Sequence, residues 1–198
     1  MKPLRPLVFA VALTSAGCIH TDDPDAEQSA TTSSVALGLR RAVCINGPSY
    51  YGGIDPSAVD AVVAIRPHCV RLNVRVTARE SSPAALDEGV MRQYDALLER
   101  YRNERIQPYL LLHAETLGLG ETAARDPARR AALVANWAAI VARYRDRVRY
   151  FEVYNEPNNW VGPSDPKLAP GDFAALLCDA YRAIRGAHPD WPVELVSG

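Results

Sequence analysis

Two spacings of apolar residues follow one another along the chain from Arg41 onward. Short segments with alternating or continuous apolar residues predict strands, and longer segments with apolar residues three or four apart predict amphipathic helices. The predicted strands cover residues 42–45, 69–76, 107–114, 148–155 and 192–197. Four predicted helices separate them, and two of these helices open with an Asp-Pro pair, at residues 55–56 and 126–127. This strand–helix alternation predicts a parallel sheet.

The two faces of each predicted strand decide whether the sheet is open or closed. An open, doubly wound sheet has helices on both sides, so its strands are apolar on both faces. Here one face is polar each time: in the second strand Val70 and Leu72 alternate with Arg71 and Asn73. That pattern fits a barrel, whose outer face packs under helices and whose mixed face lines the interior. We therefore expect an α/β fold, a (β/α)8 TIM barrel truncated after about strand five.

The N-terminal segment has a different character. Lys2 and Arg5 precede an apolar run that ends at Leu13, and small residues then lead to Cys18. This order predicts an export signal peptide over residues 1–18. The ending at Cys18 resembles the lipobox of bacterial lipoproteins, which implies lipidation of this cysteine, although Ser15 stands where a leucine is usual. We expect an exported bacterial protein, either a cell-envelope lipoprotein or, alternatively, a secreted protein.

A polar stretch follows the signal peptide. Residues 19–38 are too poor in large apolar residues to fold and are predicted to be a flexible tether, so residues 39–198 form the partial barrel domain. In an exported protein Cys44, Cys69 and Cys178 can be oxidised, and the first two lie on neighbouring predicted strands. The pattern leaves both a disulfide and buried free thiols open.

Composition narrows the function classes. The 198 residues carry a formal net charge of −1, which offers no basic stripe for nucleic acid. Nothing after the first residues is apolar for long enough to span a bilayer, so membrane contact is expected only through a lipid at Cys18. No Cys or His spacing suggests a metal site, and no cofactor is expected. No glycine-rich phosphate loop follows the first strand, which disfavours a nucleotide-binding fold.

Polar side chains gather where the predicted strands end, which is where catalytic residues lie in a barrel. His113 and Glu115 lie at the end of the third strand, and Asn155 and Glu156 lie at the end of the fourth. Cleavage of a glycosidic bond needs one carboxylic acid that protonates the leaving oxygen, and a second carboxylate as nucleophile or base. We expect Glu156 at a partly buried rim, where it can serve as that acid.

The segment from Phe151 to Asn158, which reads Phe-Glu-Val-Tyr-Asn-Glu-Pro-Asn, resembles the fourth-strand signature of clan A glycoside hydrolases, especially the cellulase-like families 5 and 39. The resemblance implies that Glu156 is the general acid/base and that Asn155 bonds the sugar 2-hydroxyl at the cleavage site. It also implies that Arg71 supports the nucleophile and that His113 contacts the substrate. It extends over about residues 43–198.

Each assignment has a structural alternative. Arg71 could instead form a buried ion pair with Glu152 or Glu115, and His113 could be an interior histidine whose hydrogen bonds are satisfied. Trp160, in the loop after the motif, could stack on a sugar ring or pack within its own loop. Glu152 lies deeper in the barrel and is interpreted as structural. Glu115 is not expected to be the nucleophile, because the resemblance implies one on strand seven.

The expected function is hydrolysis of O-glycosyl bonds in a β-linked polysaccharide or oligosaccharide, by a retaining mechanism in the full-length form. Strands six to eight and the nucleophile are not in this sequence, so this chain by itself is expected to be inactive. The alternative is a non-catalytic surface lipoprotein that binds carbohydrate. An aldolase or lyase barrel is disfavoured, because no strand end carries a lysine for a Schiff base. The pattern determines neither the glycan nor the oligomeric state.

Overall fold

The computed structural model describes residues 43–47, 54–75, 86–114, 123–162, 165–166 and 168–197, and only the main chain of residues 123, 160–162 and 165–166. The predicted signal peptide with Cys18 and the predicted tether lie outside the described residues. So do Glu115 and the side chain of Trp160. Among the described residues, no helix combines the length and the apolar character needed to cross a bilayer.

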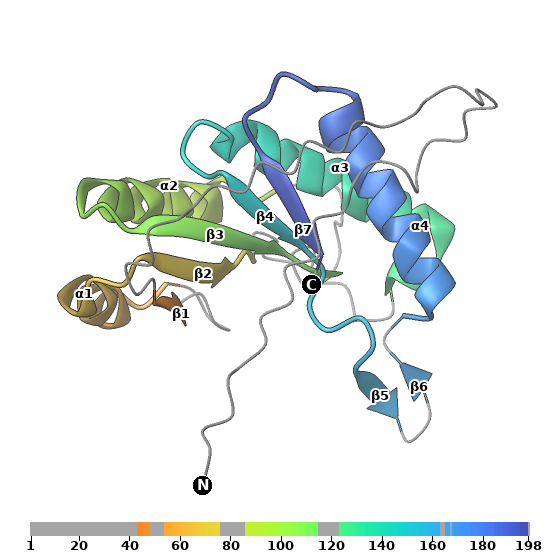
Figure 1. Cartoon of the computed structure of the whole chain (residues 1–198), viewed down its shortest axis with the longest axis horizontal. Coiled ribbons are helices and arrows are strands. Elements are labelled where there is room, and N and C mark those ends of the chain that lie inside the picture. The colour runs from red at the N-terminus through yellow and green to blue at the C-terminus, as the bar shows by residue number, and fades with distance from the viewer. Residues whose placement is uncertain are drawn as a thin grey trace, which may run out of the picture.

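Five strands form one parallel sheet in the order in which they occur along the chain (Figure 1). They are β1 (Cys44–Asn46), β2 (Cys69–Asn73), β3 (Gln107–Leu112), β4 (Tyr150–Val153) and β7 (Glu194–Ser197). An order without reversal means that every right-handed crossover moves in the same direction and leaves its helix on the same face. A doubly wound sheet would reverse its order at a switch point. The arrangement is that of part of a (β/α)8 barrel, as the strand faces predict.

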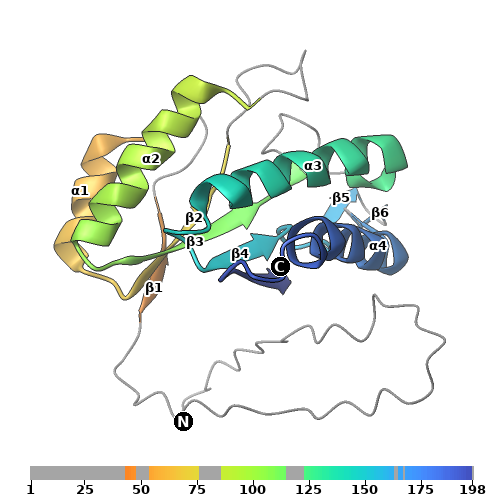
Figure 2. The same ribbon diagram turned by 90° about the horizontal axis from the view of Figure 1, so that it is seen from above.

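In the described part of the chain, four α-helices connect the strands and lie along one side of the sheet (Figure 2). They are α1 (Pro56–Ile65), α2 (Glu88–Asn103), α3 (Pro127–Tyr144) and α4 (Pro170–Tyr181), and a π-helical turn, η4 (Arg182–Gly186), extends the last one. The predicted Asp-Pro starts are confirmed. Asp55 accepts a hydrogen bond from the Ser57 N–H at 2.9 Å, and Asp126 accepts one from the Arg129 N–H at 2.9 Å. These caps satisfy amide groups that the first helical turn leaves without partners.

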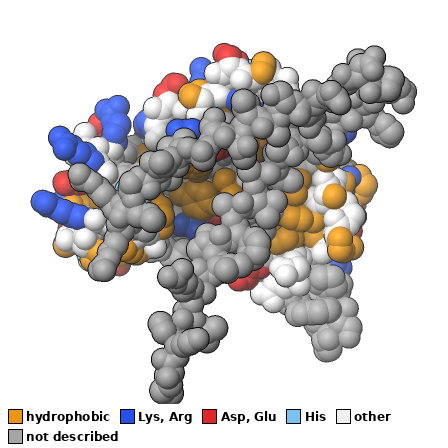
Figure 3. All heavy atoms as spheres, viewed as in Figure 1, with side chains coloured by type: hydrophobic (Ala, Val, Ile, Leu, Met, Phe, Trp, Pro, Cys, Tyr) orange, Lys and Arg blue, Asp and Glu red, His pale blue; other side chains and the backbone are white. Residues whose placement is uncertain are grey.

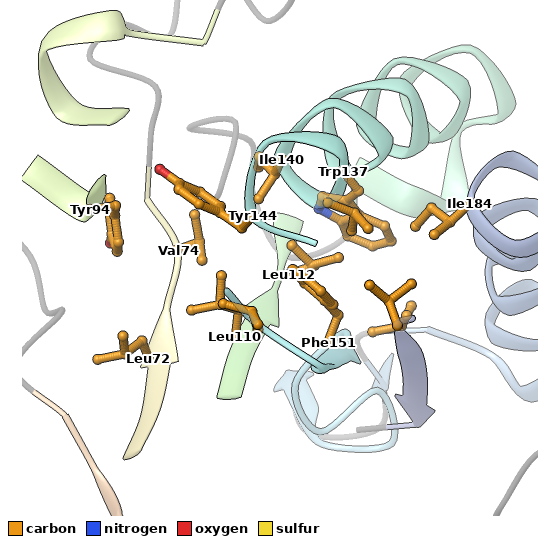
Figure 4. Close-up of a cluster of buried hydrophobic side chains, with 14 of the residues drawn as sticks. Leu72, Val74, Tyr94, Leu110, Leu112, Trp137, Ile140, Tyr144, Phe151 and Ile184 are labelled. Atoms are coloured by element: carbon orange, nitrogen blue, oxygen red, sulfur yellow. The ribbon is translucent and has the colours of Figure 1, made fainter. Parts of the chain in front are cut away.

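The hydrophobic core lies between the sheet and these helices. Strand residues on the helix-facing side meet aromatic and aliphatic side chains of the helices, and all of them are buried: Leu72, Val74, Leu110, Leu112 and Phe151 from the strand segments, with Tyr94, Trp137, Ile140, Tyr144 and Ile184 from the helical segments (Figure 4). In β2 burial alternates strictly, so Arg71 and Asn73 lie on the opposite face. The predicted separation of an apolar outer face from a mixed inner face is therefore confirmed for this strand.

The edge strand β1 is tied to β2 in two ways. Cys44 and Cys69 are register partners and form a disulfide, which decides between the two alternatives for this pair. Gly47 follows β1 and donates its N–H to the Arg71 carbonyl at 2.8 Å. A Cβ atom at Gly47 would lie 2.5 Å from Leu72 Cδ2 and 2.6 Å from Val70 Cγ2, so these buried side chains would have to move to admit a larger residue.

A short 3₁₀ helix, η3 (Ala123–Arg125), precedes α3, and two short strands follow β4. The short strands β5 (Trp160–Gly162) and β6 (Asp165–Pro166) pair antiparallel as a ribbon beside the sheet, which the apolar pattern does not predict because so short a segment carries no periodicity (Figure 1). On the outer surface, arginine side chains with acidic ones among them are exposed over α1 and α2 (Figure 3). The Arg102–Glu99 pair, at 2.7 Å, is one of these exposed contacts.

Candidate active site

Strand β4 ends at Val153, two residues earlier than predicted, because the backbone then leaves the extended conformation. Tyr154 has φ 69° and Glu156 has φ 46°, both in the left-handed region that non-glycine residues rarely adopt. The Tyr154 N–H still donates to the Leu112 carbonyl at 2.8 Å, so this residue continues the strand contact with β3. The change of conformation buries Tyr154 and leaves Glu156 exposed. The expectation of a partly buried Glu156 is therefore wrong.

A buried ion pair lies at the base of the site. Arg71 Nε donates to Glu152 Oε2 at 2.6 Å, and Arg71 Nη2 donates to Glu152 Oε1 at 2.7 Å. The Glu152 side chain is only 9% exposed, and its strand is separated from β2 by β3. Two parallel N–H···O bonds to one carboxylate fix both side chains in a single geometry. Of the two predicted ion-pair partners of Arg71, the structure shows Glu152.

Tyr109 is a member of this cluster that the sequence pattern does not single out. It lies on β3 in register with Arg71 on β2, and it interacts electrostatically with Glu152. Burial, and then the negative charge of the Glu152 carboxylate, raise the pKa of Tyr109 above its ordinary value. The phenol therefore stays neutral, and it can serve as a donor to the carboxylate.

Asn155 connects the buried pair to the rim. Arg71 Nη2 donates to Asn155 Oδ1 at 2.9 Å. Since a guanidinium only donates, this bond identifies which end of the Asn155 amide carries the oxygen. The amide nitrogen then faces the acid, and Asn155 Nδ2 donates to Glu156 Oε2 at 3.4 Å. The hydrogen-bonded chain thus runs from Glu152 through Arg71 and Asn155 to the exposed Glu156.

Asn159 also contacts the acid, although the sequence pattern does not single it out. Its Nδ2 donates to Glu156 Oε2 at 3.1 Å, and its backbone N–H donates to the Glu156 carbonyl at 3.0 Å. The second bond closes a four-residue turn with Pro157 at its second position, where proline is favoured. The sequence Glu-Pro-Asn-Asn favours such a turn, and it is the local pattern that could have indicated that residue 159 folds back over residue 156.

His113 lies inward of these groups. It is 2% exposed, and its ring lies 4.6 Å from the ring of Tyr154, with the two planes inclined at 47°. The Trp137 indole donates to the His113 carbonyl at 3.4 Å, which ties the end of β3 to α3. The predicted contact of His113 with substrate stays a prediction. This packing also explains how Tyr154 is held in its left-handed conformation, because its ring is buried against a fixed partner.

A tyrosine from α2 fixes the end of β2. The Tyr94 hydroxyl donates to the Asn73 carbonyl at 2.8 Å and accepts the Arg75 N–H at 3.1 Å. These two bonds satisfy backbone groups where the strand ends, and they hold the main chain that carries Arg71.

The structure thus brings together Arg71, Asn155 and Glu156 of the predicted site. Among the described residues, no group of three or more His, Cys, Asp or Glu side chains could hold a metal ion.

Comparisons with known proteins support the fold. No protein-family model and no curated protein matches the chain. Among solved structures, a glycoside hydrolase has 22% identity and a TM-score of 0.58 over 76% of this chain and 50% of its own. A family 39 glycoside hydrolase from the gut symbiont Bacteroides cellulosilyticus has 19% identity and a TM-score of 0.52, covering 77% of this chain and 31% of its own. An aphid myrosinase has 16% identity and a TM-score of 0.50, covering 70% of this chain and 34% of its own.

The chain thus spans about half the length of the first of these structures and about a third of the other two. At these identities the likeness concerns the fold. The same architecture follows from the strand order and from the helices along one side of the sheet. The described chain has the fold of part of a (β/α)8 barrel, as the faces of its strands predict, and it shares this fold with glycoside hydrolases of known structure.

Proposed function

We propose that this protein contributes the acid/base half of a retaining glycosidase acting on β-linked oligosaccharides or polysaccharides. The observation that carries the proposal is the hydrogen-bonded chain from the buried Glu152 to the exposed Glu156. It holds one solvent-accessible carboxyl group at the carboxyl end of a barrel strand, which is where catalytic residues lie in this fold. The fold likeness to glycoside hydrolases supports the reaction class.

In the proposed reaction Glu156 gives its proton to the departing glycosidic oxygen while a second carboxylate attacks the anomeric carbon. Water then hydrolyses the glycosyl intermediate after Glu156 takes up one of its protons. Asn155 is proposed to bond the sugar 2-hydroxyl, as the resemblance implies. Glu152 is unsuited to the role of nucleophile, because its side chain is only 9% exposed and is out of reach of a sugar at the rim.

The second carboxylate is proposed to come from a further strand of the barrel, about 5 Å from Glu156. We accordingly expect this chain alone to bind oligosaccharides without cleaving them at a normal rate. The strands that would complete the barrel are not among the five sheet strands that the structure describes. The glycan is left open, since loops of those strands would line much of the binding cleft.

An external nucleophile tests the role of Glu156 in the chain itself. Azide can attack the anomeric carbon of phenyl β-glucosides or β-xylosides, provided that an acid protonates the departing phenolate. We expect azide-dependent phenol release, and we expect Glu156→Gln to lower its rate by about 10² or more. The control is Glu194→Gln, since Glu194 is an exposed residue paired with Arg149 on β7. Equal rates in the Glu156→Gln variant and the wild type would refute proton donation.

Binding measurements alongside the azide assay distinguish the proposed glycosidase from the alternative, a non-catalytic carbohydrate-binding protein. Binding of cello- or xylo-oligosaccharides without azide-dependent release in the wild type would favour a carbohydrate-binding protein. Rapid cleavage without azide, lost in Glu156→Gln, would instead show that the chain needs no further carboxylate.

We also propose that the protein is exported, either anchored to the cell envelope through Cys18 or secreted. The Cys44–Cys69 disulfide supports an oxidising compartment. Mass spectrometry of the mature protein from its native host tests the anchor, because lipidation adds a diacylglyceryl mass at Cys18. A mature N-terminus without that mass would favour secretion.

A further inference from the structure

The turn after β4 directs a second amide at the acid. Asn159 bonds Glu156 twice, through its backbone N–H to the carbonyl at 3.0 Å and through Nδ2 to Oε2 at 3.1 Å. The Leu168 N–H donates to the Pro157 carbonyl at 2.9 Å, so the turn is held from a second side as well. Pro157 is buried, which fixes the corner of the turn. The position of the Asn159 amide is therefore set by the backbone.

Two side-chain amides contact the same carboxylate oxygen of Glu156. Asn155 Nδ2 and Asn159 Nδ2 both donate to Glu156 Oε2, at 3.4 and 3.1 Å. The orientation of Asn155 is fixed because Arg71 occupies its oxygen at 2.9 Å. A side-chain amide nitrogen only donates, so an oxygen that faces two of them is stable as an acceptor and unsuited to carry a proton. The two oxygens of this carboxyl group are thus chemically different.

We propose that Asn159, together with Asn155, positions the acid so that Oε2 is the acceptor and Oε1 carries the proton that is transferred. The proposal rests on the proposed function of Glu156 and adds a residue to it. Asn159 is a positioning residue, since it acts on the reacting atoms through Glu156. Its effect is to direct the proton outward, away from the turn.

The hydrogen bond can be tested without any catalysis. In the intact protein, labelled with ¹⁵N, the side-chain amide protons of Asn159 should shift downfield in a pH titration when the Glu156 carboxyl group becomes charged, since a charged acceptor strengthens the bond. The shift should disappear in Glu156→Gln. The exposed Asn158 amide in the same turn is the control. An Asn159 response that persists in Glu156→Gln, or one no larger than that of Asn158, would overturn the proposal.

The azide reaction tests the consequence for proton transfer. Asn159→Leu should slow release of phenol, a poor leaving group, by about tenfold or more, because the acid loses part of its orientation. Release of 2,4-dinitrophenol, which leaves without a proton, should change less than twofold, and Asn158→Leu should affect neither substrate. Equal losses on both substrates would indicate a merely structural role for Asn159. If the wild type released neither phenol, the proposed function would fail while the amide titration would still decide the hydrogen bond.

Discussion

At the scale of single residues, burial separates two ion pairs of nearly equal length. The Arg71–Glu152 contact is 2.6 Å and has side chains 28% and 9% exposed, whereas Arg102–Glu99 is 2.7 Å and has side chains 63% and 44% exposed. An exposed pair exchanges hydrogen bonds with water at little net gain, but a buried pair leaves an uncompensated charge when one partner is lost. The surroundings, and not the distance, therefore set the contribution of each pair.

Glu152→Gln is accordingly expected to lower the free energy of unfolding by about 2–3 kcal/mol, since Arg71 would keep its charge without a carboxylate. Glu99→Gln makes the same chemical change on the surface and should cost less than about 0.5 kcal/mol. Urea denaturation at neutral pH measures both. Equal values for the two variants would show that the Arg71–Glu152 pair is solvated in the protein.

At the scale of elements, a cluster of charges connects α2 to α3. Asp95 on α2 contacts Arg143 at 2.6 Å and Arg147, just after α3, at 2.9 Å, and Arg143 also contacts Glu88 at 2.6 Å. Hydrogen bonds from Arg143, more than those from Arg147, lower the pKa of Asp95 against the opposing effect of its burial. The same bonds raise the pKa of Arg143. The two helices are thus held by charge as well as by the apolar core.

The sign of the pH dependence follows from that shift. Because the pKa of Asp95 is lower in the folded state, its contribution is complete above the unfolded value of about 4 and is lost as the pH falls through the folded value. Asp95→Asn should therefore cost about 1–2 kcal/mol at pH 7, and the gap to the wild type should narrow below about pH 4. Urea unfolding at a series of pH values checks this.

The control for that experiment is Asp60→Asn on α1. Asp60 is 74% exposed, and its nearest cation atom, on Arg100, is 3.7 Å away. Its replacement should change stability by less than about 0.5 kcal/mol at each pH. A gap between Asp95→Asn and the wild type that stayed constant down to pH 3 would contradict an ionic contribution from Asp95.

At the scale of the whole molecule, one core joins the sheet to all of its helices. Residues of β2, β3 and β4 and of α1, α2, α3 and α4 belong to a single cluster of buried side chains, part of which Figure 4 shows. Ile140 lies within it and is 0% exposed, whereas Ile65, at the end of α1, is 65% exposed. A protein with one core is expected to unfold cooperatively when that core is weakened.

Ile140→Ala should lower the free energy of unfolding by about 2–5 kcal/mol, from lost burial and the cavity left behind. Ile65→Ala removes the same atoms from the surface and should stay within about 0.5 kcal/mol. Urea titrations followed by helical circular dichroism and by tryptophan fluorescence should give one midpoint for each variant. Separate midpoints in the two signals would indicate that sheet and helices do not share a single core.

Local chemistry explains how much of the fold could be predicted. The Asp-Pro starts of α1 and α3 depend on contacts within one helical turn, and the alternation of Val70, Arg71 and Leu72 depends on the pleat of one strand. The helix starts and the strand alternation can both be predicted, because each depends only on residues that are neighbours in the sequence. Glu156 could likewise be singled out, because the residues around it form a continuous motif. Its exposure could not, since that follows from the left-handed conformations at residues 154 and 156.

What the sequence determined by itself is therefore the order of elements, the two faces of the strands and the carboxyl group at the end of β4. Tertiary structure decided which groups meet there. Glu152 lies 81 positions from Arg71 in the sequence, and their pairing depends on the register of β2, β3 and β4. The Cys44–Cys69 disulfide likewise depends on the register of β1 and β2. Register is fixed by packing across the whole sheet, and so the sequence pattern could name each of these contacts only as one of several alternatives.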